Sequence, residues 1–84
     1  MSPAKFKQIR EHLGLTQTDL AELLGLSGKM PISHFETGFR TPSPLIVAFM
    51  SYLGSLSEKK ARDFLEEFKR HMDKARRAAK DSST

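Results

Sequence analysis

The chain has 84 residues, which is enough for one small domain and leaves little room for a second. It contains no cysteine, so disulfide bonds and thiolate metal sites are excluded and its stability must come from packing. Lysine and arginine number 14 against 10 for aspartate and glutamate, and the net charge of +4 permits an anionic partner without identifying one.

Helical signals begin at the N-terminus. Ser2 followed by Pro3 is an N-cap with proline at the first helical position, which predicts a helix that Gly14 ends. Apolar residues fall on one face of it, at Phe6, Ile9 and Leu13. Thr16 predicts the N-cap of a second helix, with Asp19 in the capping-box position and Gly25 as its terminator.

The third helix is short and begins late. It must contain Ile32 and Phe35 and stop near Gly38. Pro31 is poorly tolerated inside a helix that starts at Ser27, because its ring blocks an i−4 hydrogen bond. We therefore expect Pro31 at the first helical position and Met30 as a poor cap, after a long exposed turn.

Two more helices complete the chain. Ser43 and Pro44 open a fourth helix through Leu53, which Gly54 is expected to close, and Ser57 caps a fifth over residues 58–80. Residues 81–84 are expected to be a disordered polar tail. No run alternates in the manner of a strand, so the predicted fold class is all-α with five helices.

The charge divides unevenly at Leu56. Residues 1–56 carry five basic and four acidic side chains, a net charge of +1, whereas residues 57–84 carry nine and six, a net charge of +3. We expect two parts, a helix-turn-helix domain over residues 1–56 and an amphipathic helix over residues 57–80. The basic residues of this last helix are either a solvated face or contacts to phosphate.

The last helix carries a heptad-spaced apolar seam, formed by Ala61, Leu65, Phe68, Met72, Ala75 and Ala79. Its first half is expected to close the domain core and its second half to pair with another subunit. The fourth helix is apolar almost all round, which is typical of a central helix or of half an interface. We therefore expect a homodimer, with contacts from Phe49, Tyr52, Phe68 and Met72.

The run from Phe6 to Leu53 resembles the lambda-repressor-like helix-turn-helix domains of the Xre or Cro/C1 family. The matching stretches are "IREHLGLTQTDLAELLGLS" and "ISHFETGFRTPS", followed by the apolar fourth helix. The resemblance implies a compact five-helix fold that binds the major groove of DNA through its third helix, as a homodimer on a two-fold symmetric operator.

The chain departs from the family at one place. From Gly25 to Ile32 it is one residue longer than is usual, and the extra residue lies between Ser27 and Pro31. We expect Lys29 and Met30 to project from this turn towards the groove. A methionine there is suited to a thymine methyl group, and a lysine to guanine acceptors or a phosphate.

The resemblance also implies individual roles. Gln17 and Thr18 open the second helix, where relatives contact the DNA backbone, and Ser33 and His34 occupy positions that read base edges. Arg40 matches a basic position on the backbone. Glu36 matches an acid that holds Arg10 in an internal ion pair. The predicted DNA-binding residues are thus Gln17, Thr18, Ser27, Lys29, Met30, Ser33, His34 and Arg40.

Nothing in the sequence indicates catalysis or a cofactor. His12, His34 and His71 lie in three different helices without partners at metal-ligand spacing, and no phosphate loop or nucleophile motif is present. The longest apolar run, residues 45–50, is too short to cross a bilayer, so we expect a cytoplasmic protein.

Two functions remain open. The first is a sequence-specific transcription regulator, most simply a repressor, that binds double-stranded DNA. The second is a protein-interaction module, such as an antitoxin or a bridging factor, whose DNA binding is secondary. The mild charge of residues 1–56 keeps the second function open.

Overall fold

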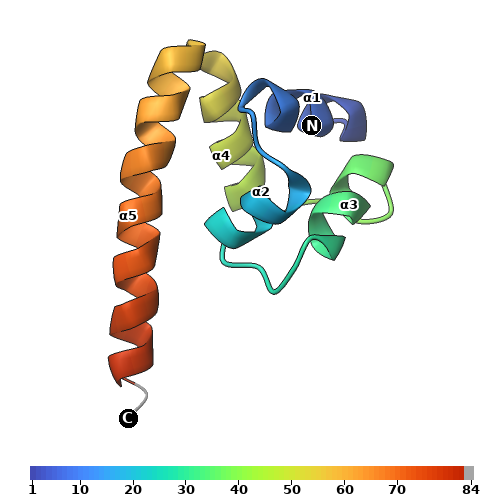
Figure 1. Ribbon diagram of the computed structural model, residues 1–84. Coiled ribbons are helices and arrows are strands. Elements are labelled where there is room, and N and C mark those ends of the chain that lie inside the picture. Colours follow the sequence, from blue (N-terminus) through green and yellow to red (C-terminus); the bar gives the residue numbers. More distant parts are fainter. Residues whose placement is uncertain (83–84) are drawn as a thin grey trace.

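In the computed structural model, the backbone is described for residues 1–82 and the side chains for residues 1–79. These residues form α1 (Pro3–His12), α2 (Gln17–Leu23), α3 (Met30–Thr37), α4 (Pro44–Ser55) and α5 (Glu58–Ser82), with no strand among them (Figure 1). The predicted all-α fold is confirmed. Helix α5 continues to Ser82, so the prediction of a disordered tail is wrong for residues 81–82, and residues 83–84 lie outside the described residues.

The predicted N-caps are confirmed at four helices. The hydroxyl of Ser2 accepts a hydrogen bond from the backbone N–H of Lys5 at 3.1 Å. At α2 the capping box is complete, since Thr16 Oγ1 accepts from the N–H of Asp19 at 3.0 Å and the Asp19 carboxylate accepts from the N–H of Thr16 at 3.1 Å. Ser43 and Ser57 cap α4 and α5 in the same way. These side chains satisfy backbone donors that a helix leaves free at its start.

Besides the end of α5, two predicted helix boundaries are wrong. Helix α3 starts at Met30 rather than at Pro31, and its N-cap is Lys29, whose side chain makes no capping hydrogen bond. Helix α4 runs through Gly54 to Ser55. A Cβ atom on Gly54 would lie 3.1 Å from the side chain of Ile9, so this glycine allows α1 and α4 to approach closely instead of ending the helix.

The core lies where α1 packs on α3 and α4, and α2 on α3. Its largest fully buried side chains are Phe6, Leu20, Ile32, Met50 and Leu53. The rings of Phe6 and Phe35 meet edge to face, with centroids 5.6 Å apart. These contacts join residues from all of the first four helices, so the core fixes α3 relative to the rest of the domain.

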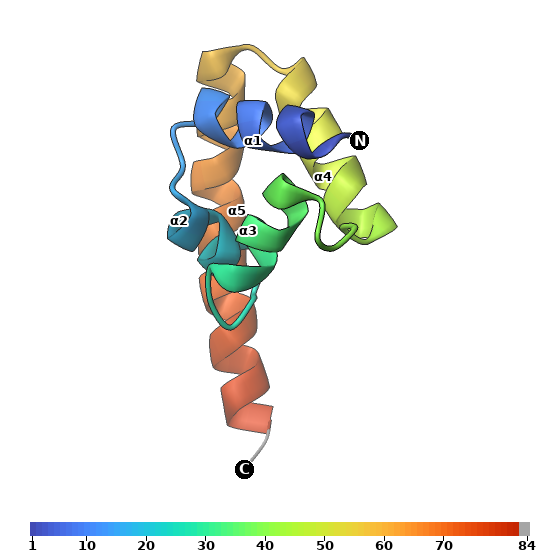
Figure 2. The ribbon, with the colours of Figure 1, turned by 90° about the vertical axis from the view of Figure 1, so that its right-hand side faces the viewer.

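Helix α5 runs along one side of the molecule and extends beyond α2 at its C-terminal end (Figures 1 and 2). Its first turns close the core, because Ala61 is buried and Leu65 and Phe68 pack against the core residues. In Figure 1 α3 lies on the opposite side of the molecule from α5, with α2 between them, and in Figure 2 α3 faces the viewer with α5 behind it. The long helix therefore leaves the exposed side of α3 uncovered.

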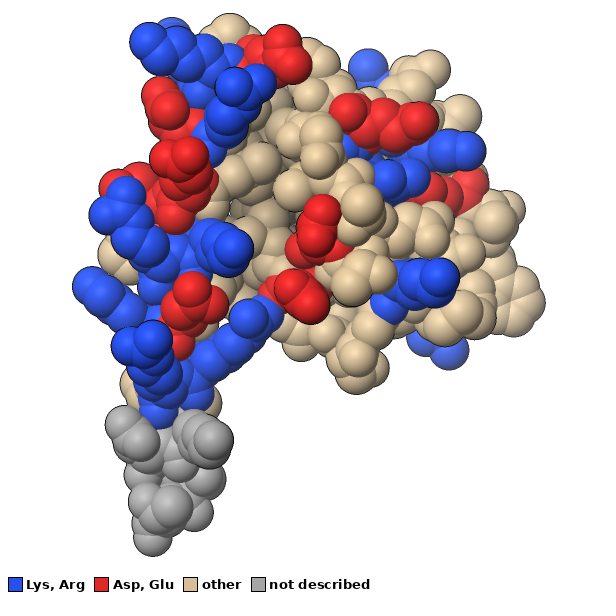
Figure 3. Space-filling model, viewed as in Figure 1, with Lys and Arg blue, Asp and Glu red and all other residues tan. Residues whose placement is uncertain are grey.

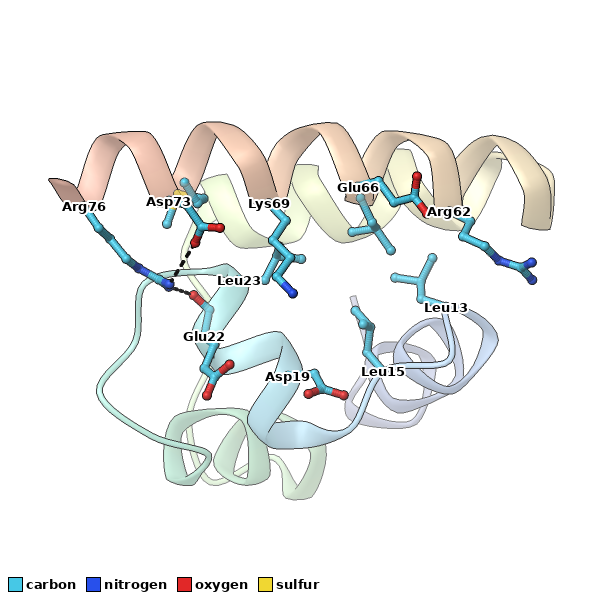
Figure 4. Close-up of a pocket in the computed structure, with 12 residues that line it drawn as sticks. Leu13, Leu15, Asp19, Glu22, Leu23, Arg62, Glu66, Lys69, Asp73 and Arg76 are labelled. Atoms are coloured by element: carbon cyan, nitrogen blue, oxygen red, sulfur yellow. Dashed lines mark hydrogen bonds and ion pairs between the residues drawn. The ribbon is translucent and has the colours of Figure 1, made fainter. Parts of the chain in front are cut away.

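A groove of about 360 Å³ separates α5 from α1 and α2 (Figure 4). Leucine side chains, including Leu13, Leu15 and Leu23, line it, and charged side chains surround its mouth. At one end Arg76 bridges the groove, since its guanidinium donates to the carbonyl of Glu22 and lies 3.8 Å from Asp73. Helix α5 is thus joined to α2 by a polar contact at this end of the groove.

Candidate nucleic-acid interface

A half-buried polar cluster fixes the start of α2 against α3. Arg10 Nε and Nη2 donate to the two carboxylate oxygens of Glu36 at 2.6 and 3.1 Å, and Nη1 donates to the carbonyl of Leu15 at 2.8 Å. This confirms the predicted ion pair. The side chains of Arg10 and Glu36 are 12% and 5% exposed, and the hydrogen bond to Glu36 raises the pKa of Arg10.

Gln17 belongs to the same cluster. Its Nε2 donates to Glu36 Oε1 at 3.2 Å, so the first side chain of α2 is bound to the middle of the cluster. Thr18, the next residue, is exposed. The hydrogen bond to Glu36 thus holds the N-terminal turn of α2 beside α3.

The turn between α2 and α3 is tight at its start and exposed at its end. Gly25 has φ of 74°, and the N–H of Leu26 returns to the carbonyl of Ala21 at 2.8 Å. Ser27 and Lys29 are exposed, and Met30 is 58% exposed at the first position of α3. The prediction of a long exposed turn before α3 is confirmed.

Helix α3 presents one face to the core and another to the outside. Ile32 and Phe35 are buried, as predicted. Helical periodicity places four other residues together on the outer face of α3, namely Met30, Ser33, His34 and Thr37. Ser33 and His34 are half-buried, so they are less exposed than the outward positions predicted for them.

Directly after α3, Phe39 lies beside His34, although it is not among the DNA-binding residues predicted from the sequence. Gly38 has φ of 83°, and the chain turns back so that the N–H of Arg40 donates to the carbonyl of His34 at 3.2 Å. Phe39 is 74% exposed, and its ring lies 4.7 Å from the ring of His34. The sequence does contain a signal for Phe39, because it is an aromatic residue between the glycine and the arginine of "ETGFR".

The four residues predicted for dimerisation do not form one group. Phe49 and Phe68 have ring centroids 5.2 Å apart, and Tyr52 joins them through Phe64 at 5.6 Å. Met72 lies instead at the turn between α2 and α3, where its Cε would be 3.4 Å from a Cβ on Gly25. Three of the four residues therefore share one aromatic cluster on α4 and α5.

The charged side chains of the molecule are concentrated on α5. Figure 3 shows Lys and Arg along this helix, interleaved with Asp and Glu, and fewer charges over the rest of the visible face. Three exposed ion pairs within α5, at Arg62–Glu58, Arg70–Glu67 and Arg76–Asp73, neutralise part of the charge. The surface around α3 contributes Lys29 and Arg40, both exposed.

No helix among the described residues is long and apolar enough to span a membrane. Neither curated proteins nor solved structures gave a match to the chain. A model of the helix-turn-helix family matches residues 6–51, which is more than half of the chain and covers most of α1, all of α2 and α3, and most of α4. The protein therefore belongs to the lambda-repressor-like (Xre/Cro-C1) helix-turn-helix family of DNA-binding transcription regulators.

Proposed function

We propose that this protein is a sequence-specific repressor that binds a two-fold symmetric operator as a homodimer, with α3 in the major groove. The observation that carries the proposal is the cluster of Arg10, Glu36 and Gln17, which holds the N-terminus of α2 beside α3. In the proposed complex, α3 contacts bases in the major groove and the first turn of α2 contacts the adjacent DNA backbone. The two helices must keep a fixed relative position to make both contacts at once.

The exposed and half-buried residues around α3 are chemically suited to contact base edges and the phosphate backbone. Met30 offers an apolar contact to thymine methyl groups, and Ser33 and His34 offer hydrogen-bonding groups to base edges. Lys29 and Arg40 stand at the two ends of α3 and are suited to the phosphates on either side of the groove. Gln17 and Thr18 are suited to the backbone at the start of α2.

An exposed apolar face of α4, beside half-buried rings of α5, supports the homodimer. Leu45 is 79% exposed and Tyr52 is 53% exposed, on a face of α4 that adjoins the ring cluster of Phe49, Phe64 and Phe68. A contiguous apolar surface on a small domain favours burial against a partner. Because a two-fold symmetric contact uses the same surface twice, this one surface would serve both subunits of the proposed homodimer.

The proposal is tested by fluorescence anisotropy with a duplex taken from upstream of the protein's own gene and a scrambled duplex, each at two salt concentrations. We expect tighter binding to the first duplex and weaker binding to both at higher salt. Lys29→Ala and Arg40→Ala should each lower the slope of log K against log salt by about 1. Lys59→Ala, on α5, is the control that should leave this slope unchanged. Equal, weak binding to both duplexes would contradict specific recognition and favour the interaction module.

A further inference from the structure

Phe39 is the most exposed aromatic residue beside α3. Single apolar side chains at a surface are common and need no explanation. This one, however, is not isolated, because its ring packs at 4.7 Å and 52° against His34, a residue of the outer face of α3. The exposed ring and the candidate base-reading residue therefore form one unit.

The backbone holds the two rings together. The carbonyl of His34 accepts a hydrogen bond from Thr37 Oγ1 at 3.3 Å and another from the N–H of Arg40 at 3.2 Å. Between these two anchors Gly38 adopts the left-handed conformation, which turns the chain back over the last turn of α3. Phe39 is thus placed against His34 by the local fold and not by a flexible loop.

The two ring nitrogens of His34 differ in their surroundings. Among the described side chains, Nδ1 of His34 is buried without a hydrogen-bond partner, and Nε2 is not among such atoms. A neutral imidazole carries its proton on one nitrogen only. Because an orphaned buried N–H is rarer in folded proteins than an under-used acceptor, we assign the proton to Nε2. The accessible edge of His34 is then a hydrogen-bond donor.

We propose that Phe39 is a positioning residue for base recognition: it holds the His34 ring so that Nε2–H donates to the N7 or O6 acceptor of a purine in the major groove. This inference rests on the proposed function, since it requires α3 to read base edges. Guanine presents both acceptors and adenine presents N7, so a purine at one position of each half-site is the expected preference.

The test is selection from a pool of randomised duplexes, followed by sequencing of the bound fraction. We expect wild type to prefer a purine at one half-site position, and Phe39→Ala and His34→Ala to lose that preference alone. Phe39→Tyr keeps the ring and should retain the preference. His12→Ala, on the exposed side of α1, controls for loss of a histidine elsewhere.

The affinity of each variant for the selected duplex tests the same proposal quantitatively. Loss of one hydrogen bond should weaken binding about five- to tenfold in either single variant, and the double variant should be no weaker than His34→Ala alone. If Phe39→Ala keeps the purine preference that His34→Ala loses, the role of Phe39 is overturned while the proposed function survives. If wild type shows no base preference at any position, both proposals are overturned.

A measurement on the free protein is independent of DNA. Long-range ¹H–¹⁵N correlation spectra of the imidazole nitrogens should show the Nε2–H tautomer in wild type and a mixture of tautomers in Phe39→Ala. An Nδ1–H tautomer in wild type would overturn the assignment to purine acceptors. Because Phe39 is 74% exposed, its replacement should leave the unfolding temperature nearly unchanged, and the same samples verify this.

Discussion

Arg10 and Glu36 connect the folding of this domain to its proposed contact with DNA. Their ion pair joins α1 to α3, and Gln17 attaches α2 to the same carboxylate. The sequence resemblance was sufficient to predict the pair. It was not sufficient to predict the contact of Gln17, because that contact depends on how closely the first turn of α2 approaches α3.

We expect Arg10→Met to lower the free energy of unfolding by about 3 kcal/mol, because the carboxylate of Glu36 would be left largely buried without its partner. Urea unfolding followed by circular dichroism measures this. The exposed pair of Arg70 and Glu67 supplies the control, since Arg70→Ala should change stability by less than about 1 kcal/mol. Equal losses in the two variants would contradict a structural role for the Arg10–Glu36 pair.

Asp19 introduces a dependence of stability on pH. The hydrogen bond from the backbone N–H of Thr16 lowers the pKa of the Asp19 carboxyl below its usual value of 3.8. A lowered folded-state pKa stabilises the fold above the unfolded-state pKa, and this contribution is lost as the pH falls through the folded-state value. Asp19→Ala should therefore have a lower free energy of unfolding than wild type at neutral pH. The difference between the two free energies should narrow below pH 3.8. Urea unfolding of both proteins across the acid range checks this; a constant gap would contradict it.

At the scale of elements, local signals predicted helix starts better than helix ends. Ser2, Thr16, Ser43 and Ser57 cap their helices through hydrogen bonds to residues three positions later, so the sequence carries the whole signal. Helix α3 begins at Met30 without any capping side chain, which no sequence pattern marks. Gly54 resembles a helix terminator, but its role depends on contact with α1, a helix distant in sequence.

Replacing Gly54 separates the two interpretations of that residue. Gly54→Ala improves helix propensity by about 1 kcal/mol, but the added Cβ would lie 3.1 Å from buried Ile9, whose branched side chain has little freedom to move. We expect a net loss of about 1 kcal/mol in the free energy of unfolding, measured with urea. Gly28→Ala is the matched control, because nothing lies within 4 Å of its added Cβ. A stabilised Gly54→Ala protein would contradict the close packing of α1 and α4.

For the whole molecule, the structure shows where the net positive charge lies relative to α3. The excess of basic residues lies mainly on α5, on the opposite side of the molecule from α3 (Figures 1 and 3). The net charge therefore does not indicate the proposed DNA-binding surface on α3, which was inferred from the helix-turn-helix pattern. The contact between His34 and Phe39 escaped prediction because it forms only once Gly38 turns the chain back.

The homodimer predicts a concentration-dependent mass in sedimentation equilibrium. Leu45→Glu combined with Tyr52→Glu places two charges on the exposed apolar face of α4 and should shift the protein towards monomer without unfolding it. Lys59→Glu changes the net charge by the same amount on exposed α5 and should leave the equilibrium unchanged. A wild-type mass that stays monomeric at all concentrations would contradict the dimer.

Helix α3 is the element that we propose distinguishes one DNA sequence from another. Its most direct test is the ratio of affinities for a selected duplex and a scrambled one, measured for wild type and for the triple variant Met30→Ala, Ser33→Ala and His34→Ala. The control carries Gln8→Ala and His12→Ala on exposed α1. We predict that the ratio falls to near one in the triple variant and is unchanged in the control. A triple variant that keeps the wild-type ratio would contradict sequence reading by α3.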